Sequence, residues 1–495
     1  MRYPTIKTSN TKSWDIDLFL CIVLVLLAPY AIFDSIARSY VNYFNTIQFQ
    51  IDWVIILLCL LRFCLLLTSK TKNKRILKLY FIFFPLLVVT VYTLLISFYQ
   101  TDFLIENGLR QVITGVPVKN IIVKRGIKYL AYTTLAIYIG LVLNNFVKIH
   151  KTLLYLTCSL CVTEILGILQ SIIFLVADYN ILHVAESISE QSFTGTSTSV
   201  TFLGMNFVRI NSISHEPKGF AILIFHLLII KIFWSSYRFQ AGLSSKTSNI
   251  LDVYLCHTSW LSVLVIFLSF SGSGLFSLIF LMLIFTIANW KDFLTLSFLK
   301  RKSIYLVISA STLLALFLEG DIFYSYIYDF WDASILRRMS AFFNQFTLES
   351  LYVSSLDPED GAVINNLINY PNSVFWGIGF GGYSNLSIDF VSNRYDLGLE
   401  NTSPFSRNIL VEILFSSGIV GLIGCFMFVK RVLLRFCLKM SIYRLLGLMI
   451  ISSFLVRSSE ILFFVNIGIL AALTVNLRLI QSNYSATHNQ SKYRV

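Results

Sequence analysis

The sequence predicts an all-α polytopic membrane protein with about 12 transmembrane helices and one large loop on the outer side of the membrane. Of its 495 residues, 56% are hydrophobic and only 13% are charged, and the mean hydropathy is +0.73. Soluble domains carry about 25% charged residues. The composition therefore excludes an ordinary soluble protein.

The predicted helices are apolar runs that are long enough, or nearly so, to cross a bilayer at about 1.5 Å per residue. They lie at residues 17–35, 51–68, 79–99, 127–146, 153–177, 218–236, 253–270, 274–290, 303–319, 406–429, 443–457 and 460–477. The first run lacks a small-x-small cleavage site, so we expect an uncleaved span rather than a signal peptide. Asp15 and Asp17 stand where this run begins, and acidic side chains favour a helix N-terminus.

Basic residues gather towards the end of every even-numbered run or beyond it, and so predict the orientation. They are Lys70, Lys72, Lys74, Arg75, Lys78, Lys148, Lys151, Lys231, Arg238, Lys246, Lys291, Lys300, Arg301, Lys302, Lys430, Arg431, Arg435, Lys439 and Arg444. Cytoplasmic loops carry such an excess of Lys and Arg. Both termini are therefore expected in the cytoplasm. The formal net charge of +13 has this origin, so no nucleic-acid partner is expected.

The connection after the third run breaks this pattern, because it is basic although it is expected outside. It carries Arg110, Lys119, Lys124 and Arg125. Either these residues bind an anion or the count of spans is wrong at this point.

The predicted spans divide the chain into four regions. Residues 1–318 hold spans one to nine with an outer segment at 178–217, and residues 319–407 form the large outer loop. Residues 408–477 hold spans ten to twelve, and 478–495 form a cytoplasmic tail. The loop is rich in aromatics, which disordered segments lack, so we expect an ordered cap with short helices. Apolar residues at helical spacing (Ile335, Met339, Phe342 and Phe346) predict one amphipathic helix in it, lying on the membrane or packed on the bundle.

The outer segments gather residues that suit phosphate chemistry. Arg209, Arg337, Arg338, Arg394 and Arg407 each offer a planar fork of donors that matches phosphate oxygens. His215 or Glu216, just before span six, could accept a proton from an attacking hydroxyl. The alternatives stay open: the arginines could snorkel at the interface or form structural ion pairs, and His215 and Glu216 could cap the helix.

Two kinds of chemistry are not expected. The chain contains no Gly-x4-Gly-Lys-Ser/Thr loop, so nucleotide hydrolysis is not predicted. His215-Glu216-Pro217 does not continue to a second histidine, so a zinc site is not predicted either. We therefore expect no cofactor and no metal.

Several local patterns, in order along the chain, resemble O-antigen polymerases of the Wzy type. They are Arg209 followed by His215-Glu216-Pro217 and Gly219-Phe220-Ala221; the Ser-rich hinge Leu268–Leu275; Gly377-x-Gly379-x-Gly381 with Tyr383; and Arg407-Asn408 with Glu412, Gly418 and Gly421. The long loop contains no histidine. If a loop histidine is the base in that family, this chain must use His215, Glu216 or the acceptor itself.

The resemblance implies a metal-independent, inverting glycosyltransferase with a GT-C-like architecture in the bacterial cytoplasmic (inner) membrane, its large loop in the periplasm. It would transfer a growing glycan from undecaprenyl diphosphate to a new lipid-linked repeat unit, beside a flippase and a chain-length regulator. The catalytic residues would be Arg209, His215, Glu216 and Arg407. The substrate-binding residues would be Lys218, Arg337, Arg338, Arg394, Asn408, Glu412, Trp376 and Tyr383, with Asn408 and Glu412 orienting Arg407 and the aromatics stacking on sugars.

Two other functions remain possible from the sequence. An O-antigen ligase, which joins finished polymer to lipid A–core, uses the same donor. A lipid-linked oligosaccharide flippase also has about twelve spans, but transporters show internal repeats and ionisable residues at mid-membrane. Glu164 is the main residue of that kind here.

Overall fold

The computed structural model describes about half of the chain. These residues are 15–28, 51–68, 73–100, 118–177, 199–202, 205–208, 210, 212, 217–240, 250–269, 271, 274, 277–278, 358–383, 386–387, 390, 409–433, 447–451 and 462–476. They belong to two compact units. Unit 1 comprises Met1–Ser159, Ser236–Ser244 and Pro358–Val495, and unit 2 comprises Leu160–Ser235 and Ser245–Asp357. The boundary at 357/358 falls inside the loop predicted at 319–407.

Except for two short helices in the predicted loop, the described helices overlap predicted apolar runs, as expected for a membrane protein. Three of them, Lys74–Tyr99, Val147–Ala177 and Ile409–Val432, are long and apolar enough to cross a membrane, and a pair bent by 65° (Ile250–His257 and Ser259–Leu268) could form a fourth span. The run at 303–319, nearly all of 274–290 and the amphipathic stretch 335–346 lie outside the described residues. The total of twelve spans and their orientation stay predictions.

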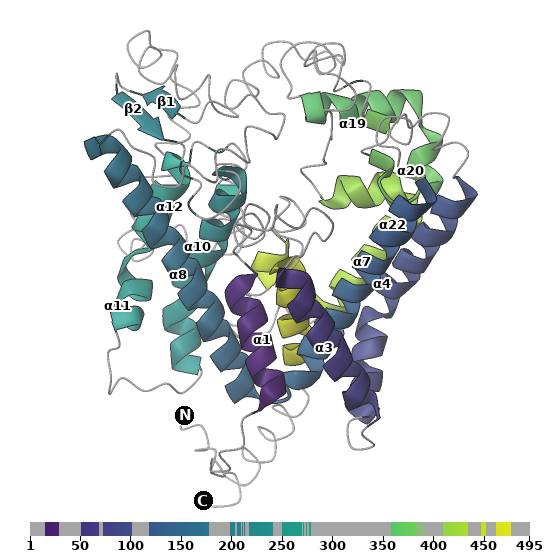
Figure 1. Cartoon of the computed structure of the whole chain (residues 1–495), viewed down its shortest axis with the longest axis horizontal. Coiled ribbons are helices and arrows are strands. Elements are labelled where there is room, and N and C mark those ends of the chain that lie inside the picture. The colour runs from purple at the N-terminus through teal and green to yellow at the C-terminus, as the bar shows by residue number, and fades with distance from the viewer. Residues whose placement is uncertain are drawn as a thin grey trace, which may run out of the picture. The chain divides into compact units, whose positions relative to one another are not determined.

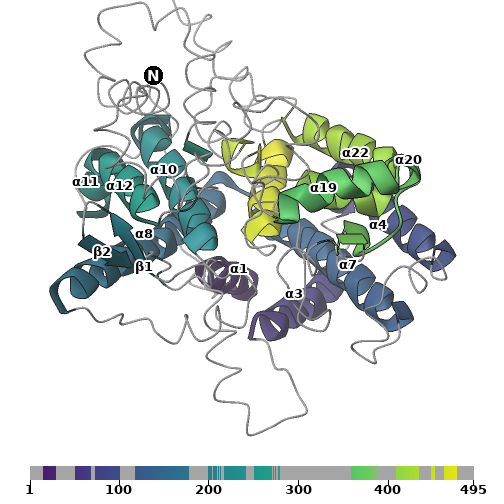
Figure 2. The ribbon, with the colours of Figure 1, turned by 90° about the horizontal axis from the view of Figure 1, so that it is seen from above.

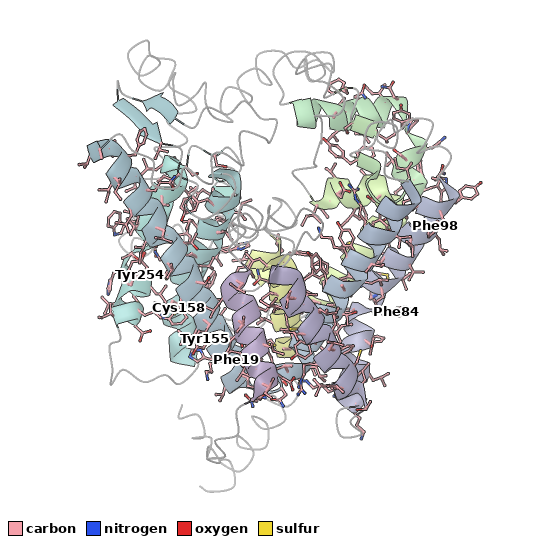
Figure 3. All side chains as sticks on the ribbon, in the orientation of Figure 1. Phe19, Phe84, Phe98, Tyr155, Cys158 and Tyr254 are labelled. Carbon is pink, nitrogen blue, oxygen red and sulfur yellow. The ribbon has the colours of Figure 1, made fainter. Side chains whose placement is uncertain are left out.

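Unit 1 is a bundle around three long helices, α4 (Asn73–Tyr99), α7 (Val118–Val142) and α22 (Ile409–Leu433). Helix α4 packs against both α7 and α22, as Figures 1 and 2 show. Helices α1 (Ile16–Leu27) and α3 (Ile51–Leu67) pack on each other and on α7. Phe84 and Phe98 on α4 (Figure 3) are about half exposed, which suits side chains that face lipid.

Two short helices of the predicted outer loop complete the described part of unit 1. They are α19 (Pro358–Asn369) and α20 (Asn372–Trp376), and α20 packs against α22. An ordered loop with short helices was predicted, although the one helix predicted at a definite place, around residues 335–346, lies outside the described residues.

Side-chain contacts show that α4 runs antiparallel to both of its neighbours. Arg75, at the start of α4, bonds to Gly140 near the end of α7, while Leu94, late in α4, lies at Gly126. Helix α22 is also antiparallel to α4, because Arg431, late in α22, contacts Phe81, early in α4, and Ser417 contacts Thr93, later in α4. One end of the bundle therefore carries the start of α4 and the ends of α7 and α22.

Arg75 satisfies the end of α7. Its guanidinium donates to the carbonyl oxygens of Gly140 at 2.9 Å and Leu143 at 3.0 Å, and to Oδ1 of Asn476 at 2.7 Å. The last carbonyls of a helix have no partner within the helix, and in an apolar bundle an unpaired carbonyl is costly. Arg75 therefore caps α7, a role that goes beyond its predicted place in a basic cytoplasmic connection.

Arg431, on α22, satisfies a carbonyl group within α4. Pro85 lies within that helix and has no N–H, so the carbonyl of Phe81, four residues earlier, loses its helical donor. The guanidinium of Arg431 donates to that carbonyl and lies 4.3 Å above the ring of Phe81. The proline is thereby accommodated without an unpaired backbone group.

The two acidic residues at the start of α1 hold that helix, as predicted. Asp15 is its N-cap, and its side chain accepts from the backbone N–H of Leu18 at 3.2 Å. It also pairs with Lys148. Asp17 pairs with Arg62 at 2.9 Å and accepts from the hydroxyl of Tyr138 at 3.1 Å. A structural role therefore accounts for both carboxylates.

Unit 2 contains the second half of α8 (Phe146–Ala177), α10 (Pro217–Gln240), and the pair α11 (Ile250–His257) and α12 (Ser259–Leu268). Helix α10 begins at Pro217, which suits the first position of a helix. An antiparallel hairpin, β1 (Ser199–Phe202) and β2 (Met205–Val208), accompanies these helices, and all the other described elements are helical, as predicted. Its strands are rich in β-branched and aromatic residues, which favour extended structure.

We predict that replacing Arg75 by Met will destabilise unit 1 by about 2–3 kcal/mol, because the carbonyls of Gly140 and Leu143 lose a charged donor. Thermal unfolding of the purified protein in detergent measures this. The matched control is Lys74→Met, since Lys74 is exposed beside Arg75. Equal midpoints for the two variants would contradict the capping role.

Candidate functional site

A cavity of about 220 Å³ lies within unit 1, between α4, α7, α22 and the glycine-rich turn that follows α20. Its charged lining residues are Arg125 and Lys128 of α7 and Glu412 of α22. Hydroxyl groups come from Thr90, Thr93, Tyr129, Thr133, Ser416 and Ser417, and the remaining wall is mainly apolar, from Leu86, Val89, Phe380, Ile409, Ile413, Cys425, Phe463 and Phe464. The cavity thus joins a small polar site to an apolar wall, as ligand sites commonly do.

The two cations stand one helical turn apart on α7, so both project from the same side of the helix. Arg125 is partly buried and makes no hydrogen bond or ion pair with the described residues. Lys128 lies 5.6 Å from the ring centre of Tyr132. Glu412 accepts a long hydrogen bond, 3.4 Å, from Ser416. The formal charge of the lining is therefore one positive unit in excess, which favours an anionic ligand.

The guanidinium group of Arg125 packs directly against Gly381. A Cβ atom built on Gly381 would lie 1.8 Å from Nη1 of Arg125, and Gly381 has a φ of +80°. A side chain at this position would strain the backbone and push the guanidinium away. Gly381 is therefore needed for Arg125 to lie where it does.

The glycine-rich turn is held by a break in α22. Gly418 has φ +61° and ψ −158° inside that helix, so the carbonyls of Phe415 and Ser416 lose their usual helical donors. The N–H groups of Ile378 and Gly379 donate to these two carbonyls, each at 2.9 Å. The glycine-rich turn and the break of α22 at Gly418 are far apart in the sequence, but their backbone groups hydrogen-bond to each other. We call this contact the junction.

Helix α4 holds the same junction through hydroxyl groups. Ser97 accepts from the N–H of Phe380 at 2.8 Å and donates to the carbonyl of Thr93 at 2.7 Å. Thr93 and Ser417 share a hydrogen bond of 2.6 Å between their hydroxyl groups. The hydroxyl of Tyr92 donates to the carbonyl of Trp376 at 2.9 Å. Three elements are therefore fixed at one end of the cavity.

Most residues nominated from the sequence lie outside the described residues. These are Arg209, His215, Glu216, Arg337, Arg338, Arg394, Arg407 and Asn408. Lys218 lies in the first turn of α10, where only its backbone is described. Their proposed roles stay predictions.

The remaining three nominated residues lie close to the cavity or its junction. Glu412 lines the same cavity as Arg125. Trp376 is 64% exposed, while its carbonyl takes the bond from Tyr92. Tyr383 is fully buried, with its ring centre 6.0 Å from that of Phe415. In this arrangement Tyr383 is a core residue and offers no open ring face for a sugar.

Ser212, three residues after Arg209 in the sequence, is anchored on α8. Ser212 has φ +49°, an unusual value for a non-glycine residue. Its N–H donates to Gln170 at 2.8 Å and its hydroxyl to the carbonyl of Thr163 at 2.9 Å. These two bonds hold Ser212 against α8.

Sequence reasoning missed part of this site. Arg125 was noted only as one of several basic residues in an exceptional connection, and Lys128 was not nominated. Thr90, Thr93 and Ser97 were also missed, although their spacing of three and four residues places hydroxyl groups along one face of an otherwise apolar run. That polar stripe is the signal that could have found the cavity.

Comparisons with known proteins do not assign this chain to a family. No protein-family model, curated protein or solved structure matches this chain. Within the described ranges, no three His, Cys, Asp or Glu side chains lie close enough together to hold a metal ion.

We predict that Gly379→Ala will destabilise the junction by about 3 kcal/mol, because its φ is +94° and a Cβ would lie 2.2 Å from Oγ of Ser97. Gly361→Ala is the matched control, since Gly361 is helical and its Cβ would meet only two ring carbons of Phe390, at 3.2 and 3.3 Å. Thermal unfolding in detergent compares the two. A Gly379→Ala midpoint equal to that of Gly361→Ala would contradict the packing described here.

Proposed function

We propose that this chain is a polysaccharide polymerase of the bacterial cytoplasmic membrane, with the activity that its resemblance to Wzy-type O-antigen polymerases implies. It would transfer a growing glycan from undecaprenyl diphosphate to a newly translocated, lipid-linked repeat unit. The observation that carries the proposal is the cavity of unit 1, where Arg125 and Lys128 lie beside an apolar wall.

The chemistry of the donor accounts for this combination. A diphosphate needs positive charge, most of all while it leaves, because negative charge then develops on it. Arg125 offers a fork of donors for phosphate oxygens, and Lys128 adds a second charge. The isoprenoid next to the diphosphate needs an apolar surface, which Ile413, Phe463 and Phe464 offer. The cavity volume suits a headgroup and the first part of a lipid rather than a whole oligosaccharide.

The position of the cavity within the bundle also supports the proposal. Ser97 near the end of α4 and Arg125 near the start of α7 lie at one end. Arg75 and the end of α7 lie at the other. If the predicted orientation is correct, Arg75 is cytoplasmic and the cavity opens toward the outer half of the membrane. Arg125 then binds an anion, which was one of the two alternatives for its basic connection.

The proposed reaction is a displacement at the anomeric carbon. The hydroxyl of the acceptor sugar forms the new C–O bond, while the bond from the anomeric carbon to the diphosphate oxygen breaks. The electron pair goes to the diphosphate, next to Arg125 and Lys128 in this proposal. The hydroxyl proton needs a base, and the resemblance alone nominates His215 or Glu216 for this role and Arg209 and Arg407 for diphosphate contacts.

We predict that Arg125→Ala will cut the rate of polymerisation by roughly 10²–10³, because the leaving diphosphate loses a charged partner. Lys128→Ala should act in the same direction. The rate is measured as polymer formed from lipid-linked repeat units in membranes that hold equal amounts of each variant. Lys430→Ala is the matched control, since Lys430 is exposed on α22 and does not line the cavity.

Gly381→Ala provides a second, independent test of the same site. It leaves every charge in place but pushes the guanidinium of Arg125 away, so a rate loss similar to that of Arg125→Ala is expected. Wild-type rates for both Arg125→Ala and Lys128→Ala would remove the cavity from the mechanism.

We predict a similar loss of roughly 10²–10³ for Arg209→Ala, if its guanidinium also holds developing charge. A deletion strain complemented with each variant shows the outcome on a gel of surface polysaccharide. Core plus a single repeat unit in the deletion strain indicates a polymerase. Free lipid-linked polymer would indicate a ligase, and loss of all repeat units from the outer face would indicate a flippase. A wild-type ladder from the Arg209→Ala strain would refute the role of Arg209.

A further inference from the structure

Unit 2 encloses a pair of opposite charges that the proposed reaction does not use. Glu164 of α8 and Lys231 of α10 are both fully buried, with 2.6 Å between Oε2 and Nζ. Charged groups inside an apolar bundle are costly unless they are paired and hydrogen-bonded. The rest of the surroundings shows how this pair is accommodated.

The carboxylate of Glu164 connects both halves of the bent helix pair. The hydroxyl of Tyr254, on α11 (Figure 3), donates to Oε2, and the hydroxyl of Ser262, on α12, donates to Oε1. With Lys231, the carboxylate thus has three donors from three helices. Both of its oxygen atoms are satisfied inside the bundle.

The ammonium group of Lys231 lies at the break between α11 and α12. It donates to the carbonyl oxygen of Thr258 at 3.2 Å, and Thr258 is the residue between the two helices, which are bent by 65°. The ammonium also lies 4.4 Å from the ring centre of Tyr254, a distance typical of a cation–π contact. One cation therefore joins a carboxylate, the carbonyl at a helix break and an aromatic face.

A carboxylate and a carbonyl at the break of a membrane helix are the oxygen ligands that monovalent cations such as Na⁺ take in membrane proteins. Hydroxyl groups such as those of Tyr254 and Ser262 can add to such a ligand set. In this protein the ammonium group of Lys231, which belongs to α10, lies where such an ion would bind. Its single positive charge balances the single negative charge of Glu164.

We propose that Glu164 and the Thr258 carbonyl form a monovalent-cation site that the ammonium of Lys231 fills, so that the helix break is stabilised without a free ion. Shortening Lys231 to Ala removes the positive charge that faces the carboxylate and opens the space of three carbon atoms and the ammonium nitrogen. Na⁺ or K⁺, with water, can then take the place of the ammonium. This inference does not depend on the proposed glycan chemistry.

The test is the thermal unfolding of the full chain in detergent, with NaCl, KCl or choline chloride at equal ionic strength. Lys231→Ala should unfold at a lower temperature than the wild type in choline, and NaCl or KCl should raise its midpoint by about 4 °C or more. The wild type should respond equally to all three salts. Lys231→Ala/Glu164→Gln is the matched control and should lose the response to Na⁺ and K⁺.

Three results would overturn the proposal. One is a Lys231→Ala midpoint that is the same in NaCl, KCl and choline chloride. Another is an Na⁺ or K⁺ response that persists in the double variant, because the carboxylate is then not the ligand. Failure of Lys231→Ala to fold in any of the salts would also count against it, since a free cation must be able to replace the ammonium.

Discussion

In an apolar bundle, every backbone N–H and C=O group that a helix does not satisfy must find a partner in the protein. The described structure meets this requirement at four places. Arg75 satisfies the end of α7, and Arg431 satisfies the carbonyl that Pro85 leaves free. Lys231 donates to the carbonyl at the break between α11 and α12. At Gly418 the partners are not side chains but the N–H groups of the glycine-rich turn.

The break of α22 at Gly418 creates the candidate site. Because Ile378 and Gly379 must reach the carbonyls of α22, the turn is drawn into the bundle instead of lying above it. Gly381 is then brought against α7, where its lack of a side chain leaves room for Arg125. The cavity with its two cations is therefore a consequence of how a broken helix is completed. Its cationic character does not require a separate loop to close over it.

The cationic groups of the two units differ in how far nearby carboxylates balance their charge. In unit 2 the charge of Lys231 is fully balanced by Glu164, and the pair is closed to solvent. In unit 1, Arg125 and Lys128 line a cavity that contains one carboxylate, so a net positive charge faces the space. An anionic ligand is attracted to the second arrangement and not to the first. This difference separates the proposed diphosphate site from the proposed tethered cation, and it weakens the transporter interpretation of Glu164.

The sequence by itself determined the class of protein, the approximate positions of the described helices other than α19 and α20, and a helix start at Asp15 and Asp17. These features depend on local properties: apolar runs of sufficient length and acidic residues at a helix start. Only the tertiary structure decided that Arg125, Gly381 and Glu412 line one cavity, that Tyr383 is a core residue, and that Glu164 pairs with Lys231. These groups come from segments far apart in the chain. Helix pairing and side-chain packing bring them together, and the spacing of residues along one segment contains no information about which distant segment will be its neighbour.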